Sequence, residues 1–330
     1  MFGYLFTFLL ATGIALYEDP AADRLIRAAS EATYHLRLAD ARAAARELQE
    51  KYPDHPAGFL IMAETYWWEA QEDPHNQQIE ASYYRAQKLA QERAEAAVKA
   101  GTYSQTEVLA YLASAHGSYA RFEVTQHESY RRALGAGLRA HKHAEQVYAL
   151  DKEYYDVWVG LGAFNYFAGT LPSMIKPFAW LFGLHGDKKL GVQQLQTAME
   201  KARYSRTEAR IVYYSALLAN KEYAPAFPIL EKLIADYPDN FVLYSWATEW
   251  FREQKKNLEG AEYFERMHEK QLERSPRLAQ YALLEKATLQ LAHNRKTDAV
   301  QTLQRIKKIP VTDPLLSMKI QTLEKEAGKA

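Results

Sequence analysis

A regular spacing of large and small residues recurs along this 330-residue chain and constrains its fold more than any other feature. In one copy, large residues stand at relative positions 4, 7 and 11 and a small one at position 8: Phe59, Met62, Tyr66 and Ala63. These positions share one face of an α-helix, and the small residue is needed where a second helix crosses closely. The spacing therefore predicts paired helices, whose large residues pack into the second helix and the next repeat. Full or partial copies occur at Leu243, Trp246, Ala247 and Trp250, at Trp158, Leu161 and Gly162, and at Leu109, Leu112 and Ala113.

Two short strings, Tyr52-Pro53-Asp54 and Tyr237-Pro238-Asp239, end helical segments, because proline cannot continue a helix. With the spacing above, they resemble the tetratricopeptide signature, in which each repeat buries its apolar face on its neighbours. We therefore predict an all-α fold, an α-solenoid of antiparallel helix pairs that forms a tetratricopeptide-like superhelix. The expected pairs are 22–36 with 38–51, 56–71 with 78–100, 105–123 with 127–150, 155–168 with 188–202, 206–220 with 222–236, 240–254 with 258–273, and 277–293 with 296–307, followed by a capping helix at 314–327.

The first residues form an apolar run, 2–17, without a charged side chain. It is shorter than the roughly 20 residues that cross a bilayer. Its length suits a secretory signal, with small residues between Ala11 and Ala15 near a cleavage site. We therefore assign residues 1–17 to a signal, an anchor or a docking helix, and residues 18–330 to a single helical-repeat domain. The signal predicts an exported or cell-envelope protein, whereas a retained helix buried against the fold or a neighbouring subunit would suit a cytoplasmic one.

An apolar stretch, GTLPSMIKPFAWLFGLHGDKKLG, interrupts the repeats at 169–191, where an ordinary repeat has a short turn. We expect a helical insertion near 170–185, and Asp187 is placed to cap the helix that follows. The insertion either folds into the groove of the superhelix or forms a surface that contacts a membrane or a partner, because exposed apolar patches usually bind something.

The string GLGAFNYFAGTLPSMIKPFAWLFGLHGDKKLGVQQLQTAM resembles the centre of the tetratricopeptide repeat protein 39 family, which includes the yeast inclusion-body clearance protein and bacterial relatives. Members of that family have a Gly-rich first helix, an apolar helix and then a Gly-Asp-basic-x-x-Gly turn. The resemblance covers residues 105–250, and it implies a non-catalytic helical-repeat adaptor with no catalytic residues. The residues that match the turn are Gly186, Asp187, Lys188 and Gly191.

Few features of the sequence point to chemistry. The 41 basic residues equal the 41 acidic ones, which argues against a nucleic-acid binder, and the absence of cysteine excludes disulfides and thiol sites. The sequence has no phosphate-binding loop and no H-E-x-x-H zinc motif. We therefore expect no enzyme, no cofactor and no metal; the best metal candidates are His116, His127, His141 and His143.

Consecutive aromatic residues form the most prominent clusters. Neighbours on a helix point about 100° apart, so only one of them can face a given core. The other faces either a binding groove, because Tyr and Trp are enriched at binding hot spots, or the second side of a wall buried on both sides. The candidate interaction surface comprises Trp67, Trp68, Tyr83, Tyr84, Asn165, Phe178, Trp180, Phe182, Tyr213 and Asn220.

We therefore expect a non-catalytic adaptor or scaffold that binds a protein or peptide. The alternative is a structural subunit that self-assembles through repeat stacking into a ring, tube or filament. A helical metal-binding enzyme is a third hypothesis, which rests on the histidines alone. We expect no nucleic-acid partner, and membrane contact only through residues 2–17.

Overall fold

The computed structural model describes residues 14–171, 185–310 and 313–328, and most of these residues are helical. Their helices follow the expected pairs, with boundaries that differ by at most four residues; α5, for example, continues to His127 instead of ending at 123. The α-helices are α1 Pro20–Tyr34, α2 Leu38–Lys51, α3 Ala57–Glu72, α4 Gln77–Ala100, α5 Gln105–His127, α6 Tyr130–Leu150, α7 Trp158–Gly169, α9 Lys188–Lys201, α10 Arg206–Ala219, α11 Tyr223–Asp236, α12 Val242–Glu253, α13 Asn257–Leu272, α14 Pro276–Ala292, α15 Lys296–Lys307 and α16 Pro314–Gly328.

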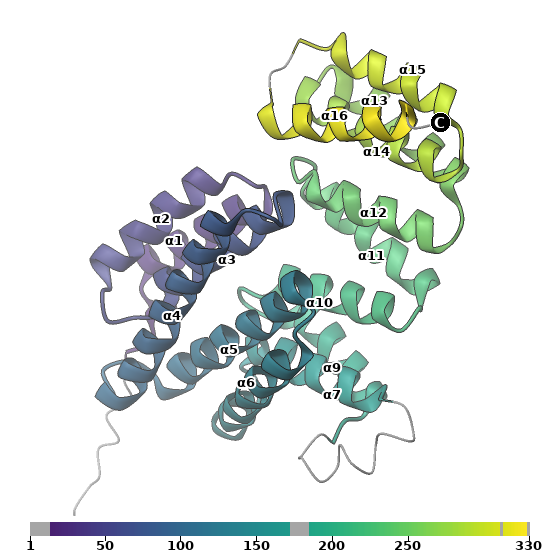
Figure 1. Cartoon of the computed structure of the whole chain (residues 1–330). Helices are drawn as coiled ribbons and strands as arrows, with labels where there is room; N and C mark the ends of the chain where they lie inside the picture. Colours follow the sequence, from purple (N-terminus) through teal and green to yellow (C-terminus); the bar gives the residue numbers. More distant parts are fainter. Residues whose placement is uncertain (1–13, 172–184, 311–312, 329–330) are drawn as a thin grey trace, which may run out of the picture. The chain divides into compact units, whose positions relative to one another are not determined.

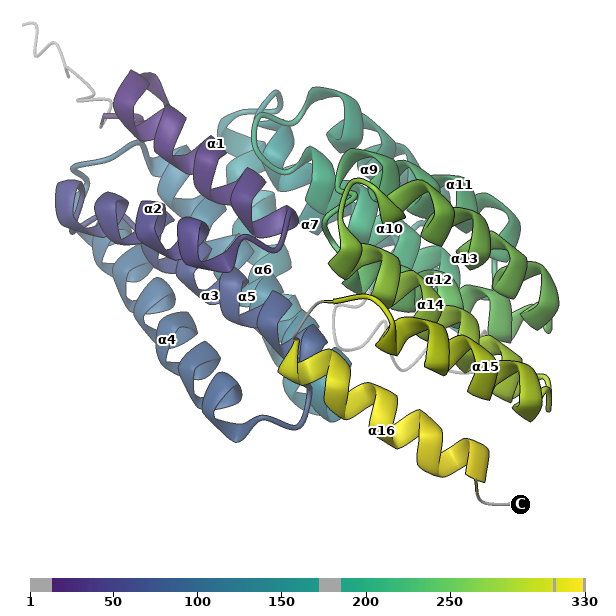
Figure 2. The ribbon, with the colours of Figure 1, turned by 90° about the horizontal axis from the view of Figure 1, so that it is seen from above.

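The chain packs as two compact units that divide within α10. Unit 1 extends to Ala209, and unit 2 consists of Arg210–Ala330 together with the short stretches Tyr34–Leu36 and Gln71–Asp73. Within each unit, successive helices form hairpins, as Figures 1 and 2 show for α5 with α6 and for α14 with α15. This is the predicted tetratricopeptide-like helical solenoid. Whether residues 18–330 form one domain stays a prediction.

The small residues at position 8 are buried, and at Gly162 the paired helix comes close. Ala63 and Ala247 are fully buried. At Gly162 of α7, a Cβ atom would lie 2.7 Å from the Cγ of Leu195 and 3.0 Å from the carbonyl oxygen of Gly191, both in α9. In this helix pair, the contacts confirm that the repeat spacing places a small residue where the paired helix comes close.

Asp187 confirms the predicted cap of α9. Its side chain accepts hydrogen bonds from the backbone N–H groups of Lys189, at 2.8 Å, and Leu190, at 3.2 Å. The carboxylate thereby satisfies two of the free N–H groups at the start of the helix. The apolar insertion before it, at 172–184, lies outside the described residues.

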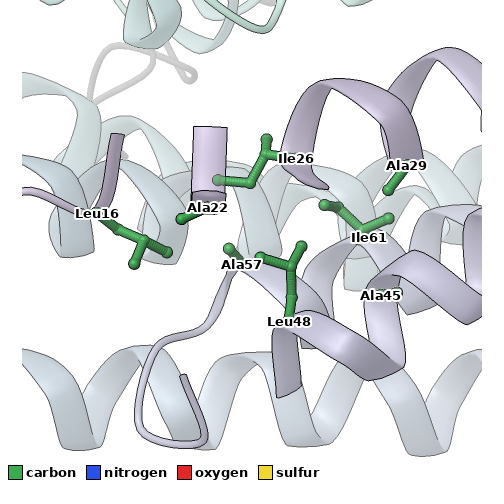
Figure 3. Packing of buried hydrophobic residues seen from close by; sticks show 8 residues of the cluster. All are labelled: Leu16, Ala22, Ile26, Ala29, Ala45, Leu48, Ala57 and Ile61. Carbon is green, nitrogen blue, oxygen red and sulfur yellow. The ribbon is translucent and has the colours of Figure 1, made fainter. Parts of the chain in front are cut away.

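The core of unit 1 includes residues from the apolar N-terminal run. Leu16 is 1% exposed and packs with residues of α1, α2 and α3, as Figure 3 shows. Ile14 donates its N–H to the carbonyl oxygen of Thr102 at 3.1 Å and accepts a hydrogen bond from the N–H of Ser104 at 2.9 Å. Residues 14–17, which the sequence assigns to a separate segment, are therefore part of unit 1. Among the described residues, no helix is both long and apolar enough to span a membrane.

Candidate interaction groove

An open groove of about 270 Å³ lies in unit 1, lined by the side chains of α2, α3 and α4. Small-molecule sites usually occupy about 300–1,000 Å³, so this groove suits a few side chains of a docked segment better than a cofactor. The helices that line it succeed one another in the chain (Figure 2). The lining residues are Arg46 and Gln49 of α2, Phe59, Met62 and Tyr66 of α3, and Ser82, Arg85, Ala86 and Leu89 of α4.

Phe59, Met62 and Tyr66 form a row along α3, which we call the apolar row. Their spacing of three and four residues places them on one face of the helix. Ala63, on the same helix, is fully buried, whereas each member of the apolar row keeps part of its surface exposed. The repeat signature predicted that these residues pack against neighbouring helices, and they do so only in part. The exposed remainder is available to a partner.

Two arginines stack on the ends of the apolar row. The guanidinium of Arg93 lies 5.3 Å from the ring centroid of Phe59, and that of Arg42 lies 4.1 Å from the ring centroid of Tyr66. Both have acidic neighbours as well: Arg42 forms an ion pair with Glu69, and Arg93 lies 3.7 Å from a carboxylate oxygen of Asp54. These two arginines therefore position the rings, and their positive charges are balanced by the neighbouring carboxylates.

Two further arginines line the groove without such a neighbour. Arg46 of α2 and Arg85 of α4 are both exposed, and within the described parts of the chain neither forms a hydrogen bond or an ion pair. Glu47, the acid next to Arg46 in sequence, pairs with Lys51. Glu92, seven residues after Arg85 on α4, pairs with Lys88. The groove therefore combines an apolar row with two uncompensated positive charges.

Three of the predicted surface aromatics, all in unit 1, lie inside the protein. Trp67 and Trp68 are each 2% exposed, and their rings meet edge to face with centroids 4.9 Å apart. Tyr83 is fully buried and stacks on Phe122 at 3.7 Å. Their burial favours the interpretation of a wall buried on both sides, and a role in binding stays a prediction.

The other predicted residues are dispersed along the chain. Tyr84 donates a hydrogen bond to Glu123 at 2.8 Å, and Tyr213 of α10 is buried. Asn165 donates to the Oε1 of Gln194 at 2.9 Å, which joins α7 to α9. Asn220 donates to the carbonyl oxygen of Ala216 at 3.0 Å, beside the end of α10. Phe178, Trp180 and Phe182 lie outside the described residues.

The groove was missed because the apolar row belongs to the repeat signature, which explains its residues by packing alone. The sequence did contain a pattern that points to the groove. Arg42 and Arg46 stand one turn apart on α2, and Arg85 and Arg93 stand two turns apart on α4. Arginines on both helices next to an aromatic and methionine row would have indicated a charged rim.

The histidines of α5 and α6 have neighbours of their own. His127 lies 3.2 Å from Glu80 and His141 lies 3.4 Å from Glu145, while the rings of His116 and His143 stack at 5.7 Å. Burial lowers the pKa of His116 to about 4. In the parts of the chain that the structure describes, no three His, Cys, Asp or Glu side chains are grouped so that they could hold a metal ion.

Comparison of the sequence with protein-family models finds no match, and comparison with curated proteins finds none either. Among solved structures, the chain is similar to a tetratricopeptide repeat protein from Parabacteroides merdae, with 13% sequence identity and a TM-score of 0.37. The similarity covers 92% of this chain and 99% of that chain.

Proposed function

We propose that this protein is a non-catalytic helical-repeat scaffold, and that the groove of unit 1 binds a segment of another protein. The observation that carries the proposal is the apolar row of α3, which remains partly exposed between two helices that each present an unpaired arginine. Aromatic residues, Met and Arg are the residue types enriched in protein interfaces, and Tyr and Arg recur at binding hot spots.

We also propose a relationship to the tetratricopeptide repeat protein 39 family, which would make the chain an adaptor. The proposal rests on the Gly186, Asp187, Lys188 and Gly191 turn. Its support is that two of the matched residues have structural tasks: Asp187 caps α9, and a Cβ atom at Gly191 would lie 2.5 Å from the backbone nitrogen of Tyr166. Because these residues cap a helix and allow a close helix approach, we expect related chains to keep them.

We propose further that the chain is exported or associated with the cell envelope, because of the apolar run at its start. The hydrogen bonds of Ile14 with Thr102 and Ser104 limit where a signal could be removed. A cut that preserves them lies before Ile14. Mass spectrometry of the natural N-terminus tests whether the apolar run is removed by a cut before Ile14. A mature chain that starts after Leu16 would contradict this cut site.

Selection from a random peptide-display library on the full chain tests the binding function. Enriched peptides are synthesised, and their affinity is measured by fluorescence anisotropy for the wild type and for Met62→Asp. We expect the substitution to abolish most of the binding, because it places a charge in the middle of the apolar row.

Met318→Asp is the matched control, since Met318 of α16 is 51% exposed and lies outside the groove. It should bind the peptides as the wild type does. Peptides that bind Met62→Asp equally well would contradict a role for the groove. Light scattering on the same samples separates peptide binding from the alternative of self-assembly, because long polymers would indicate a building block.

A further inference from the structure

We propose that the groove of unit 1 selects an acidic amphipathic helix of a partner protein, whose apolar side chains rest on Phe59, Met62 and Tyr66 while its carboxylates bind Arg46 and Arg85. This inference rests on the proposed function and specifies the chemistry of the partner. Three observations carry it: the length of the apolar row, the placement of the two arginines, and the balance of charge around them.

The length of the apolar row fits a helical occupant. Phe59 and Tyr66 are seven residues apart in α3, which corresponds to about 10.5 Å along the helix axis. A docked helix of two turns covers the same length and presents side chains at i, i+3 or i+4, and i+7, the pattern by which amphipathic helices bind in apolar grooves. The volume of about 270 Å³ suits those few side chains.

The two unpaired arginines lie on different helices of the groove. Arg46 comes from α2 and Arg85 from α4, whereas the apolar row comes from α3. Carboxylates on the two flanks of a docked helix would therefore meet one guanidinium each. Arginine binds carboxylates in a bidentate manner, so such pairs add specificity as well as attraction.

The charge around the groove favours an acidic occupant over a basic one. Of the four arginines near the apolar row, Arg42 and Arg93 have acidic neighbours, in Glu69 and Asp54. Arg46 and Arg85 remain uncompensated. A basic helix would place its charges next to these two groups and lose affinity by repulsion.

The test uses two synthetic helical probes and the full chain. The acidic probe has Leu, Leu and Phe at i, i+4 and i+7 on one face and Glu at the flanking positions; the basic probe has Lys in place of each Glu. Dissociation constants are measured by fluorescence anisotropy at about 50 mM salt, where exposed charges are weakly screened.

We expect the wild type to bind the acidic probe roughly three- to tenfold more tightly than an uncharged Gln version, since each exposed pair contributes modestly. It should bind the basic probe more weakly than the Gln version. The double variant Arg46→Glu/Arg85→Glu should reverse this order. The preference for the acidic probe should also shrink as the salt concentration rises.

The matched control is Arg131→Glu/Arg139→Glu, which changes the net charge equally on the exposed surface of α6 and should keep the wild-type order. A wild type that prefers the basic probe, or a preference that the groove variant leaves unchanged, overturns the inference. If neither probe binds but display-selected peptides do so through Met62, the acidic-helix inference fails while the binding function stands. If the wild type binds neither the probes nor any display-selected peptide, both the acidic-helix inference and the proposed binding function are overturned.

Discussion

Arg121 of α5 lies over the ring of Trp67 of α3, with its guanidinium carbon 4.0 Å from the ring centroid. The two ends of the same guanidinium form ion pairs with Glu64 of α3 and Glu208 of α10. Ser118 donates a further hydrogen bond to Glu64 at 2.5 Å. A single largely buried side chain thus joins three helices of unit 1, and it does so at one of the tryptophans predicted for a binding surface.

Replacing Arg121 should destabilise unit 1 strongly. Arg121→Ala leaves two mostly buried carboxylates near each other without a positively charged partner, and breaking a buried ion pair in this way typically costs about 3–5 kcal/mol. The free energy of unfolding, from urea denaturation followed by circular dichroism, measures the loss. Arg131→Ala, at an exposed arginine of α6, should change it by less than about 0.5 kcal/mol. A loss under about 1 kcal/mol for Arg121→Ala would show that the network is dispensable.

Gly191 sets how closely α7 and α9 approach. A Cβ atom there would lie 2.5 Å from the backbone nitrogen of Tyr166 and 2.8 Å from the carbonyl oxygen of Gly162. Backbone atoms cannot move aside as a flexible side chain can, so Gly191→Ala should cost about 1–3 kcal/mol or more.

Gly160→Ala provides the control within the same pair of helices. Gly160 also lies in α7, but a Cβ atom added to it meets nothing within 4 Å. Because alanine favours a helix over glycine, this substitution should be neutral or stabilise by up to about 1 kcal/mol. Equal effects of the two substitutions on the melting temperature would contradict the close approach at Gly191.

The helix pairs could be predicted because repeat spacing and helix caps are local. Ala63 and Ala247 are small and fully buried, Gly162 is small where α9 comes close, and Asp187 caps α9 at the expected residue. Each of these tasks depends on residues within one repeat. Sequence alone therefore located nearly every helix to within a few residues.

Long-range contacts could not be predicted in the same way. Trp67 and Tyr83 were expected to be candidates for a surface, yet Trp67 is buried beneath Arg121 from a helix more than 30 residues later. The apolar row remains partly exposed because no described helix of unit 1 covers it fully, although its spacing is that of a packed stripe. Which side of a helix is covered depends on helices that are distant in sequence, and the repeat pattern does not specify them.

The buried carboxyl group of Glu107, in α5, binds the backbone of Leu16 in unit 1. Its Oε2 accepts the N–H of Leu16 at 2.6 Å, and its Oε1 lies 3.9 Å from the Nε2 of His55. Burial raises the pKa of Glu107 to about 7, with a smaller contribution from Glu18, while Arg203 and the backbone N–H donors oppose the shift. Burial lowers the pKa of His55 to about 3, so this histidine stays neutral near pH 7.

The raised pKa of Glu107 should make stability depend on pH. The folded state holds a proton between about pH 4.5 and 7 that the unfolded state has lost, so the free energy of unfolding falls as the pH rises from about 4.5 to about 7 and levels off above that. Each unit of difference in pKa is worth about 1.4 kcal/mol, which sets an upper limit of about 3 kcal/mol. Glu107→Gln keeps an acceptor without the titration and should therefore flatten this slope. Urea denaturation at pH 5, 6, 7 and 8 measures it, and parallel curves for the two proteins would contradict the assignment.

Leu16 and Ile14 together test whether the folded unit includes the end of the apolar run. Leu16 is 1% exposed, so Leu16→Ala should cost about 2–5 kcal/mol through lost burial and a cavity. Ile14 contributes its backbone to Thr102 and Ser104, but it is 66% exposed, so Ile14→Ala should cost less than about 0.5 kcal/mol. Thermal unfolding of the two variants gives the comparison. If Leu16→Ala is as mild as Ile14→Ala, residues 14–17 do not stabilise unit 1, and the boundary after residue 17 that the sequence predicts is the right one.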